Sequence, residues 1–329
     1  MQGRETISEQ IHEQQSTRDR VGLLITGPDS AAVVTNIKAA EEAGVRQVWM
    51  TQGTPAPDTL TLFAVAAMET GSVRLGTAVV PIYQRHPLTM VQQALVFGDL
   101  APGRLRLGVG TSHRPSIEGV YGIPMKSPLE HLHEYVDILR AALWEGKVDH
   151  QGRFYTVRVT LPRTPHTPVL ISALRTGAFE LAGEVSDGAI SWMCPVSYLL
   201  DKALPALRAG AAKAGRSVPS LIAHVPVALS TDRQAVLAAA RRQLGRYGKL
   251  PFYANMFADA GFPVSADGTM SDALIDNLVV SGDEASVAAQ LVGLLSKGLD
   301  ELLVMLVPVA NAQDEQARLM QLIGQLSDK

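Results

Sequence analysis

Three short segments of this chain carry groups that could do chemistry. The segment TSHRP (111–115) holds two hydroxyls, an imidazole and a guanidinium directly after a glycine-containing apolar run. Its His113 could donate a hydrogen bond to a carbonyl or a phosphate, or transfer a proton; a merely polar surface loop is the alternative. A second segment, PIYQRHP (81–87), follows another apolar run with groups that stack, donate hydrogen bonds and carry charge. Trp49 and Trp192 close two further apolar runs; we expect both in the core, with a slot for a flat ring as the alternative.

The third segment, SALRTGAFELAGE (172–184), could bind an anion if a helix begins inside it. Thr176 and Gly177 would then present free backbone N–H groups, and Arg175 would add a positive charge. Such a helix N-terminus suits a phosphate group. Many helices begin with Thr-Gly, so a plain helix start without a ligand is the alternative.

Composition and missing motifs exclude several classes of function. The formal net charge is −3 and Lys and Arg are not concentrated anywhere, which argues against nucleic acid or an acidic membrane as a partner. No apolar run is long enough to span a membrane, and the N-terminus lacks the apolar core of a signal peptide. Cys194 is the only cysteine, and HExxH, GxxxxGK[ST], GxSxG and a complete GxGxxG are absent. We expect a soluble, cytoplasmic protein without a metal, acting on a small-molecule substrate.

A repeated order of elements must position these segments. An Ala-rich helical stretch ends near a glycine and a short apolar run follows, at 36–50, 179–193 and 290–306. The glycine supplies a helix C-cap, and uncharged apolar runs are typical of strands buried on both faces of a parallel sheet. Eight such strands with helices between them predict a closed (β/α)8 TIM barrel, with an open doubly wound sheet as the alternative. The candidate strands are 21–25, 47–51, 73–80, 104–110, 168–173, 188–193, 221–230 and 301–307.

Two connections are longer than a barrel loop requires, so we expect insertions after strands 4 and 7. Residues 144–167 contain FYTVRVTL, which predicts a short strand or hairpin outside the barrel. Residues 247–283 are rich in proline, glycine and aromatic residues and would form a lid or shape an apolar substrate pocket. Residues 1–20 read as a polar arm that is mobile or loosely attached, and 21–329 as a single barrel domain.

Four stretches, in order along the chain, resemble the luciferase-like flavin and deazaflavin oxidoreductase family. They are LGTAVVPIYQRHPLTMVQQAL, PGRLRLGVGTSH, EYVDILRAALWEGKVDHQGRFYTV and ALRTGAFELAGEVSDGAI, and the resemblance covers about residues 21–310. Within the family, RHPL and SH resemble the branch that uses the deazaflavin coenzyme F420. The resemblance implies a TIM barrel, usually a homodimer, that binds a flat tricyclic ring at the carboxyl ends of its strands.

The resemblance also implies which residues hold the cofactor. A non-prolyl cis peptide at Ala78–Val79 would form a bulge behind the ring, and Thr111, Ser112 and His113 would contact the ring edge or the cofactor's side chain. With Gln52, which follows strand 2, and Thr176 added from the strand ends, the predicted cofactor-binding residues are Gln52, Thr77, Ala78, Val79, Val80, Thr111, Ser112, Leu174, Arg175, Thr176, Gly177 and Ala178.

One departure from the family concerns acid–base chemistry. Its sugar-phosphate dehydrogenases place an acidic residue and a histidine after strand 2 and a glutamate after strand 4, where this chain has Gln52, Gly53 and His113. Oxidation of glucose 6-phosphate is therefore not expected. Reduction of an enone, imine or similar acceptor needs alignment and one proton donor, for which His113 and Tyr83 are the candidates. F420-dependent hydride transfer is the leading hypothesis; an FMN-dependent monooxygenase and a non-catalytic deazaflavin-binding relative are the alternatives.

Overall fold

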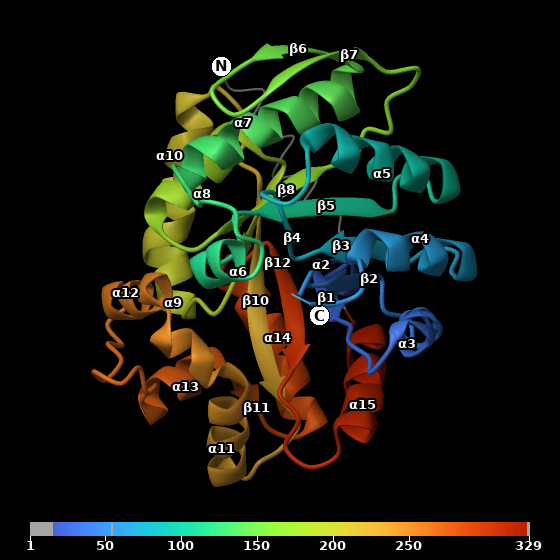
Figure 1. Cartoon of the computed structure of the whole chain (residues 1–329). Helices are drawn as coiled ribbons and strands as arrows, with labels where there is room; N and C mark the ends of the chain where they lie inside the picture. Colours follow the sequence, from blue (N-terminus) through green and yellow to red (C-terminus); the bar gives the residue numbers. More distant parts are fainter. Residues whose placement is uncertain (1–15, 54, 328–329) are drawn as a thin grey trace, which may run out of the picture.

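The computed structural model describes residues 16–53 and 55–327, and its centre is a ring of parallel strands (Figure 1). The strands consist mainly of apolar residues that are buried on both faces of the sheet. They are β1 (Val21–Leu24), β2 (Gln47–Met50), β3 (Arg74–Thr77), β5 (Leu105–Gly110), β8 (Val169–Ala173), β9 (Gly188–Ser191), β10 (Ser220–Ala228) and β12 (Glu301–Leu306). All eight coincide with strands predicted from the sequence.

Pairing between these strands closes the ring. Neighbours follow the order β1, β2, β3, β5, β8, β9, β10 and β12, and β12 pairs again with β1, always in parallel. A two-residue strand, β4 (Val80–Pro81), continues past β3 and pairs with the end of β5. A ring in which every strand has two neighbours has no free edge. The TIM barrel prediction is therefore confirmed, and the open doubly wound alternative is wrong.

Helices wrap the outside of the ring between successive strands (Figure 1). Several begin at an aspartate whose carboxylate accepts a backbone N–H of the first turn, at Asp29, Asp58, Asp232 and Asp283. The helices between strands include α3 (Ser30–Glu42), α4 (Thr59–Glu69), α5 (Pro87–Leu100), α7 (Pro128–Arg140), α8 (Thr176–Val185), α10 (Leu204–Lys213) and α14 (Glu284–Ser296), and α15 (Ala312–Gly324) follows the last strand. Shorter helical turns are η1 (Ala141–Glu145), α9 (Val196–Tyr198) and η2 (Leu199–Ala203).

The connection after the fourth strand of the ring contains the predicted hairpin. Helix α6 (Arg114–Gly119) follows β5, and after α7 the strands β6 (Lys147–Gln151) and β7 (Thr156–Thr160) pair antiparallel outside the barrel. The hairpin tip is tied to α7, because the Glu134 carboxylate accepts the backbone N–H groups of Arg153, Phe154 and Tyr155.

The connection after the seventh strand is mostly helical, and it begins before residue 247. It comprises α11 (Arg233–Leu244), η3 (Gly245–Lys249), α12 (Pro251–Asp259), α13 (Asp272–Leu278) and β11 (Val280–Ser281). Strand β11 pairs with Val227 and Ala228, the last residues of β10. The insertion therefore stands at the carboxyl ends of the ring strands, where a TIM barrel binds its ligands.

The N-terminal arm is anchored where the structure describes it. Residues 1–15 lie outside the described residues, but Thr17–Arg20 form the helical turn α2. Arg20 donates hydrogen bonds of 2.8 Å to the carbonyls of Leu299 and Asp300. For this part, the expectation of a loosely attached arm is wrong, because the guanidinium ties it to the start of β12. Among residues 16–53 and 55–327, no helix has both the length and the apolar character that a membrane crossing requires.

Polar and aromatic side chains close the barrel at the amino ends of its strands. The Arg106 guanidinium donates to both carboxylate oxygens of the buried Glu301. Trp49 lies across the interior: a Cβ on Gly76 would meet its ring at 2.3 Å, and one on Gly22 its Nε1 at 2.4 Å. Trp49 is fully buried, as expected for a core residue. Because this end is filled, a ligand can enter only at the opposite end, the mouth formed by the carboxyl ends of the strands.

Candidate functional site

Small side chains meet at the mouth, where three neighbouring strands end. Ala78 and Val79 lie between β3 and β4, and the peptide bond between them is cis, as expected. A Cβ on Gly110 would lie 2.2 Å from the Ser172 Oγ and 2.7 Å from the Val79 Cγ2, so only glycine allows these two side chains to approach so closely. Leu174, two residues beyond Ser172, is half-buried and leads into α8. We term Ala78, Val79, Gly110 and Ser172 the small-residue bed.

Thr77 and Val80 lie behind this bed and hold it in place. The Thr77 hydroxyl donates to the Gly108 carbonyl at 2.7 Å and accepts the Gly108 N–H at 2.8 Å. A Cβ on Gly108 would come within 2.0 Å of the Thr77 carbonyl oxygen, so only glycine allows this approach. The residues Thr77 and Val80 are fully buried. Thr77, Ala78, Val79 and Val80 were all predicted to bind the cofactor, but only Ala78 and Val79 belong to the bed.

The start of α8 retains the geometry of an anion site. Thr176 and Gly177 are exposed, and as first residues of the helix their N–H groups have no helical carbonyl one turn back. The Ala178 N–H donates to the Arg175 carbonyl at 2.8 Å. The Arg175 guanidinium pairs with Asp259 of α12 at 2.9 Å, and both side chains are nearly half exposed. Arg175 therefore lies where the sequence placed it, with part of its charge offset by Asp259.

His113 stands at the rim of the mouth, directly before α6. Its ring centroid is 5.8 Å from that of Tyr253 on α12. Partial burial and the nearby Arg246 guanidinium lower the pKa of His113, although the side chain keeps contact with solvent. Thr111 and Ser112 are half-buried between β5 and α6, and Ser112 turns the chain with a φ of 59°. A neutral imidazole that is exposed to solvent follows from this environment.

Tyr83 belongs to an aromatic cluster between the loop after β4, α7 and the hairpin. Its ring meets the His131 ring edge-on, with centroids 4.6 Å apart. His131 stacks on Phe154, and its Nε2 lies 2.7 Å from the Tyr155 hydroxyl. Burial raises the pKa of Tyr83, and its hydroxyl reaches the Lys126 carbonyl only at 3.5 Å. Tyr83 is thus fixed in position but has a weakly bonded hydroxyl.

Other polar residues after β2 and β4 form hydrogen bonds or ion pairs at the starts of helices. Arg85 forms an ion pair with Asp58, which caps α4, and the His86 Nδ1 accepts a backbone N–H at the start of α5. The Gln52 Oε1 accepts the Thr59 N–H at 2.8 Å. To contact a cofactor with its side chain amide, Gln52 would have to give up bonds that hold its own loop.

A set of aromatic residues meets at the mouth, and of these only His224 was not considered in the sequence analysis. Trp192, just after β9, stacks on His224 of β10, with ring centroids 3.7 Å apart and planes at 22°. Its Nε1–H donates to the Tyr247 hydroxyl at 2.8 Å. The Tyr247 and Tyr253 rings follow, 4.8 Å apart. Trp192 is half-buried, so it fits the alternative, a residue that lines a slot for a flat ring, better than the expected core position. We term Trp192, His224, Tyr247 and Tyr253 the aromatic wall.

His224 supplies a neutral polar group at the base of this wall. Its Nδ1 accepts the Met193 N–H at 3.3 Å, which places the ring hydrogen on Nε2. That Nε2 is buried, and it has no hydrogen-bond partner among the described residues. Burial lowers the pKa of His224 to about 3, so the ring stays uncharged at neutral pH.

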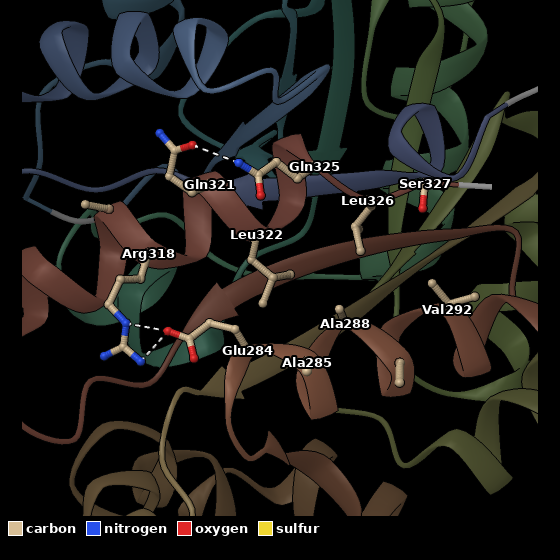
Figure 2. A pocket seen from close by; sticks show the side chains of 12 residues that line it. Glu284, Ala285, Ala288, Val292, Arg318, Gln321, Leu322, Gln325, Leu326 and Ser327 are labelled. Carbon is tan, nitrogen blue, oxygen red and sulfur yellow. Dashed lines mark hydrogen bonds and ion pairs between the residues drawn. The ribbon is translucent and has the colours of Figure 1, made fainter. Parts of the chain in front are cut away.

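A groove on the outer surface, between α14 and α15, is separate from the mouth (Figure 2). Its volume is about 630 Å³, and small and apolar side chains such as Ala288 and Leu322 line it. The Arg318 and Glu284 ion pair is part of its lining. Neither the small-residue bed nor the start of α8 belongs to this groove. Within the described part of the chain, no group of three or more His, Cys, Asp or Glu residues could hold a metal ion.

Comparison with known proteins agrees with this geometry. The family model described as luciferase-like monooxygenase matches residues 9–301. The F420-dependent glucose-6-phosphate dehydrogenase of Nocardia farcinica is 30% identical over 270 residues, which cover 78% of this chain and 80% of that protein. An uncharacterized protein of Mycobacterium tuberculosis is 32% identical over 216 residues, and the chain spans only 63% of the length of that relative.

Solved structures share the fold at lower identity. An F420-dependent secondary alcohol dehydrogenase in complex with an F420–acetone adduct superposes with a TM-score of 0.78 at 17% identity, covering 94% of this chain and 99% of that one. The FMN complex of a Baeyer–Villiger monooxygenase from Pseudomonas putida gives 0.71 at 15%, covering 94% and 97%. The barrel is common to both. With a family model that matches most of its length, the chain belongs to the luciferase-like monooxygenase family.

Proposed function

We propose that this protein is an oxidoreductase that binds coenzyme F420 and transfers a hydride between it and a small organic molecule. The small-residue bed beside the open start of α8 carries this proposal. Strands β5 and β8 are neighbours in the ring, so a bed for a flat ring and a site for a phosphate lie on adjacent strands. Two relatives named as F420-dependent glucose-6-phosphate dehydrogenases support the choice of cofactor.

The residues present fit a flat cofactor with a phosphate tail. Only glycine at position 110 lets the Ser172 hydroxyl and the Val79 side chain come together, so small side chains and one hydroxyl would lie under a flat ring. The N–H groups of Thr176 and Gly177 and the Arg175 guanidinium would hold the phosphate. When bound, the deazaflavin supplies or accepts the hydride, and the chain's residues supply alignment and a proton.

His113 is the proposed proton donor, and reduction is the proposed direction. Its imidazole lies at the rim beside Tyr253, and a lowered pKa makes the protonated form a stronger acid than an ordinary imidazolium. Tyr83, with its raised pKa, is the weaker candidate. Gln52 is a neutral amide bonded within its own loop, so no carboxylate base stands in its place. Reduction of an enone, imine or similar acceptor therefore fits better than oxidation of a sugar phosphate.

Two other functions on the same scaffold remain as alternatives. The bed would also take FMN, and the FMN-bound structural neighbour supports a monooxygenase. The neutral residues after β2 would suit a cofactor-binding relative without catalysis.

Turnover separates these functions. Chemically reduced F420 would be mixed with the protein and a panel of enones and imines without oxygen, and reoxidation of the ring followed by its absorbance. We expect acceptor-dependent reoxidation. Oxygen consumption with reduced FMN, and none with F420 and any acceptor, would instead establish the monooxygenase.

We also propose that the protein is a cytoplasmic homodimer. Four large apolar side chains stand exposed on the neighbouring helices α4 and α5, with exposed fractions of 51% for Val65, 66% for Met68, 52% for Val96 and 40% for Leu100. Apolar side chains gathered on one face are typical of a protein interface. A single buried cysteine, Cys194, is consistent with a reducing compartment.

A further inference from the structure

The aromatic wall reaches from the barrel interior to the surface of the insertion. His224 is buried in β10, and Trp192 covers it with a stacked ring. Tyr247 in η3 and Tyr253 in α12 continue the wall outward, and the Tyr253 ring lies beside His113. The proposed proton donor and the wall therefore share one side of the mouth.

A guanidinium stands at the outer end of this wall. The Arg246 Nη2 donates to the Tyr247 hydroxyl at 3.2 Å, and its Cζ lies 5.0 Å from the Tyr247 ring centroid. In the described part of the chain, no carboxylate lies within ion-pair distance of Arg246. Its neighbours differ, since Arg175 pairs with Asp259 and Arg241 pairs with an aspartate of α13.

These two features select one kind of molecule. Aromatic faces bind flat, apolar groups by stacking and by the area they remove from water. A guanidinium held over a ring presents a planar fork of donors that matches a carboxylate. The Tyr247 hydroxyl accepts hydrogen bonds from both Trp192 and Arg246, so one residue fixes the stacking surface and the fork together.

We propose that the substrate is a planar conjugated acid that lies against Trp192, the partly exposed ring of the wall, and whose carboxylate binds the exposed Arg246. The inference rests on the proposed F420-dependent reduction and adds the substrate class. A hydride adds to the carbon β to the carboxylate, and a proton from protonated His113 adds to the α carbon. The carbon–carbon double bond becomes a single bond, the cofactor is oxidised by two electrons, and His113 regains its proton from water.

Binding of a simple probe tests this without turnover. Cinnamate, methyl cinnamate and hydrocinnamate would be titrated calorimetrically into the whole protein. We expect cinnamate to bind at least tenfold more tightly than its uncharged ester, because only the acid pairs with the guanidinium. In Arg246→Met the acid and the ester should bind alike, and Arg246→Lys should retain part of the preference. Arg242→Met, an exposed arginine on α11, is the matched control and should match the wild type.

A second variant tests the stacking surface. Trp192→Leu should remove the preference for planar cinnamate over flexible hydrocinnamate while leaving the preference for acid over ester. Thermal unfolding would confirm that this variant is folded. Equal binding of acid and ester by the wild type, or an Arg246→Met variant that still prefers the acid, would overturn the proposal.

A cofactor tail is the other possible source of a carboxylate, since F420 carries a phosphate and glutamates. Fluorescence titrations with F420 and with its ring fragment lacking that tail distinguish the two. We expect both affinities to be unchanged in Arg246→Met. Loss of F420 affinity alone would assign Arg246 to the tail and overturn the substrate proposal. If neither cofactor form binds the wild type, the proposed function fails, while the cinnamate titrations still decide the role of Arg246.

Discussion

His113 combines an accessible position at the mouth with a pKa below that of an ordinary imidazole. A proton donor must be protonated to act, so the turnover that it supports falls as pH rises through its pKa. Because partial burial and Arg246 lower that pKa, turnover should fall at a pH below about 6.5, the usual pKa of histidine.

His113→Ala should therefore lower turnover by about 10²-fold, the usual share of a general acid, with little change in F420 affinity. The fall of kcat with rising pH should disappear with it. Arg246→Met should move the same fall to higher pH in a protein that keeps His113. His133→Ala, at an exposed histidine paired with Asp137, serves as the control. Wild-type rates in His113→Ala would show that the proton comes from another group.

Arg175 should matter for binding and not for the chemical step. Arg175→Ala should weaken F420 binding, and the loss should be larger at low salt than at high salt, because screening reduces a partly exposed ionic contact. Asp259→Asn should do the opposite, since it frees the Arg175 guanidinium from its present partner. Fluorescence titrations at two ionic strengths measure both. Unchanged affinity in Arg175→Ala would remove it from the site.

Some site residues could be predicted from position and others could not. Ala78, Val79 and His113 follow strands, and strand ends are recognisable in a barrel sequence. Thr77 and Val80 are adjacent to them but fully buried, and their positions in the sequence do not distinguish them from Ala78 and Val79. His224 and Arg246 were missed, and Trp192 was not linked to the aromatic residues of 247–283, because these residues come from separate elements that meet only in the fold. The one available signal was the alternation of side chains along a strand. Trp192 lies two residues after Ile190 and His224 two residues after Ile222, so each pair points to the same face. Ile190 points into the barrel, toward Gly108.

The closed floor of the barrel should contribute to stability. Burial would raise the pKa of Glu301, but the Arg106 guanidinium outweighs burial and holds the pKa below its ordinary value. A lowered carboxylate pKa stabilises the fold above the unfolded-state pKa, and this contribution is lost as pH falls through the folded-state pKa.

Glu301→Gln should destabilise the protein by about 3 to 5 kcal/mol at neutral pH, because it leaves the Arg106 charge buried without a partner. The double change Arg106→Met with Glu301→Met should recover much of that loss. Urea unfolding followed by circular dichroism measures both variants. A single variant as stable as the wild type would show that water already solvates this pair.

The elements of the ring were predictable and those of the second insertion were not. Buried parallel strands are recognisable in the sequence as short uncharged runs. Glycines and aspartates mark where the helices between them end and begin. In the insertion, Pro251 looks like a loop residue, yet it starts α12, where its missing N–H costs nothing. Residues 17–20 are polar like the arm before them, and only their contacts with β12 show that they are anchored.

The exposed apolar face of α4 and α5 predicts how two copies associate. Met68→Glu should shift the protein from dimer to monomer, because a carboxylate would be desolvated in the interface. Light scattering coupled to size-exclusion chromatography measures the mass. Val120→Glu, at an exposed apolar residue outside these helices, is the control and should remain a dimer. A wild type that is monomeric at micromolar concentration would contradict the proposed assembly.

The most direct measurement of the central claim is equilibrium binding of the two cofactors to the apo protein. F420 and FMN would each be titrated in, and the fluorescence of the ring followed. The bed and the start of α8 predict saturable, tight binding of F420 that Gly110→Val abolishes, since a side chain there would displace Val79 and Ser172 from the bed. Tight binding of FMN with none of F420, or binding of F420 that Gly110→Val leaves unchanged, would contradict this account.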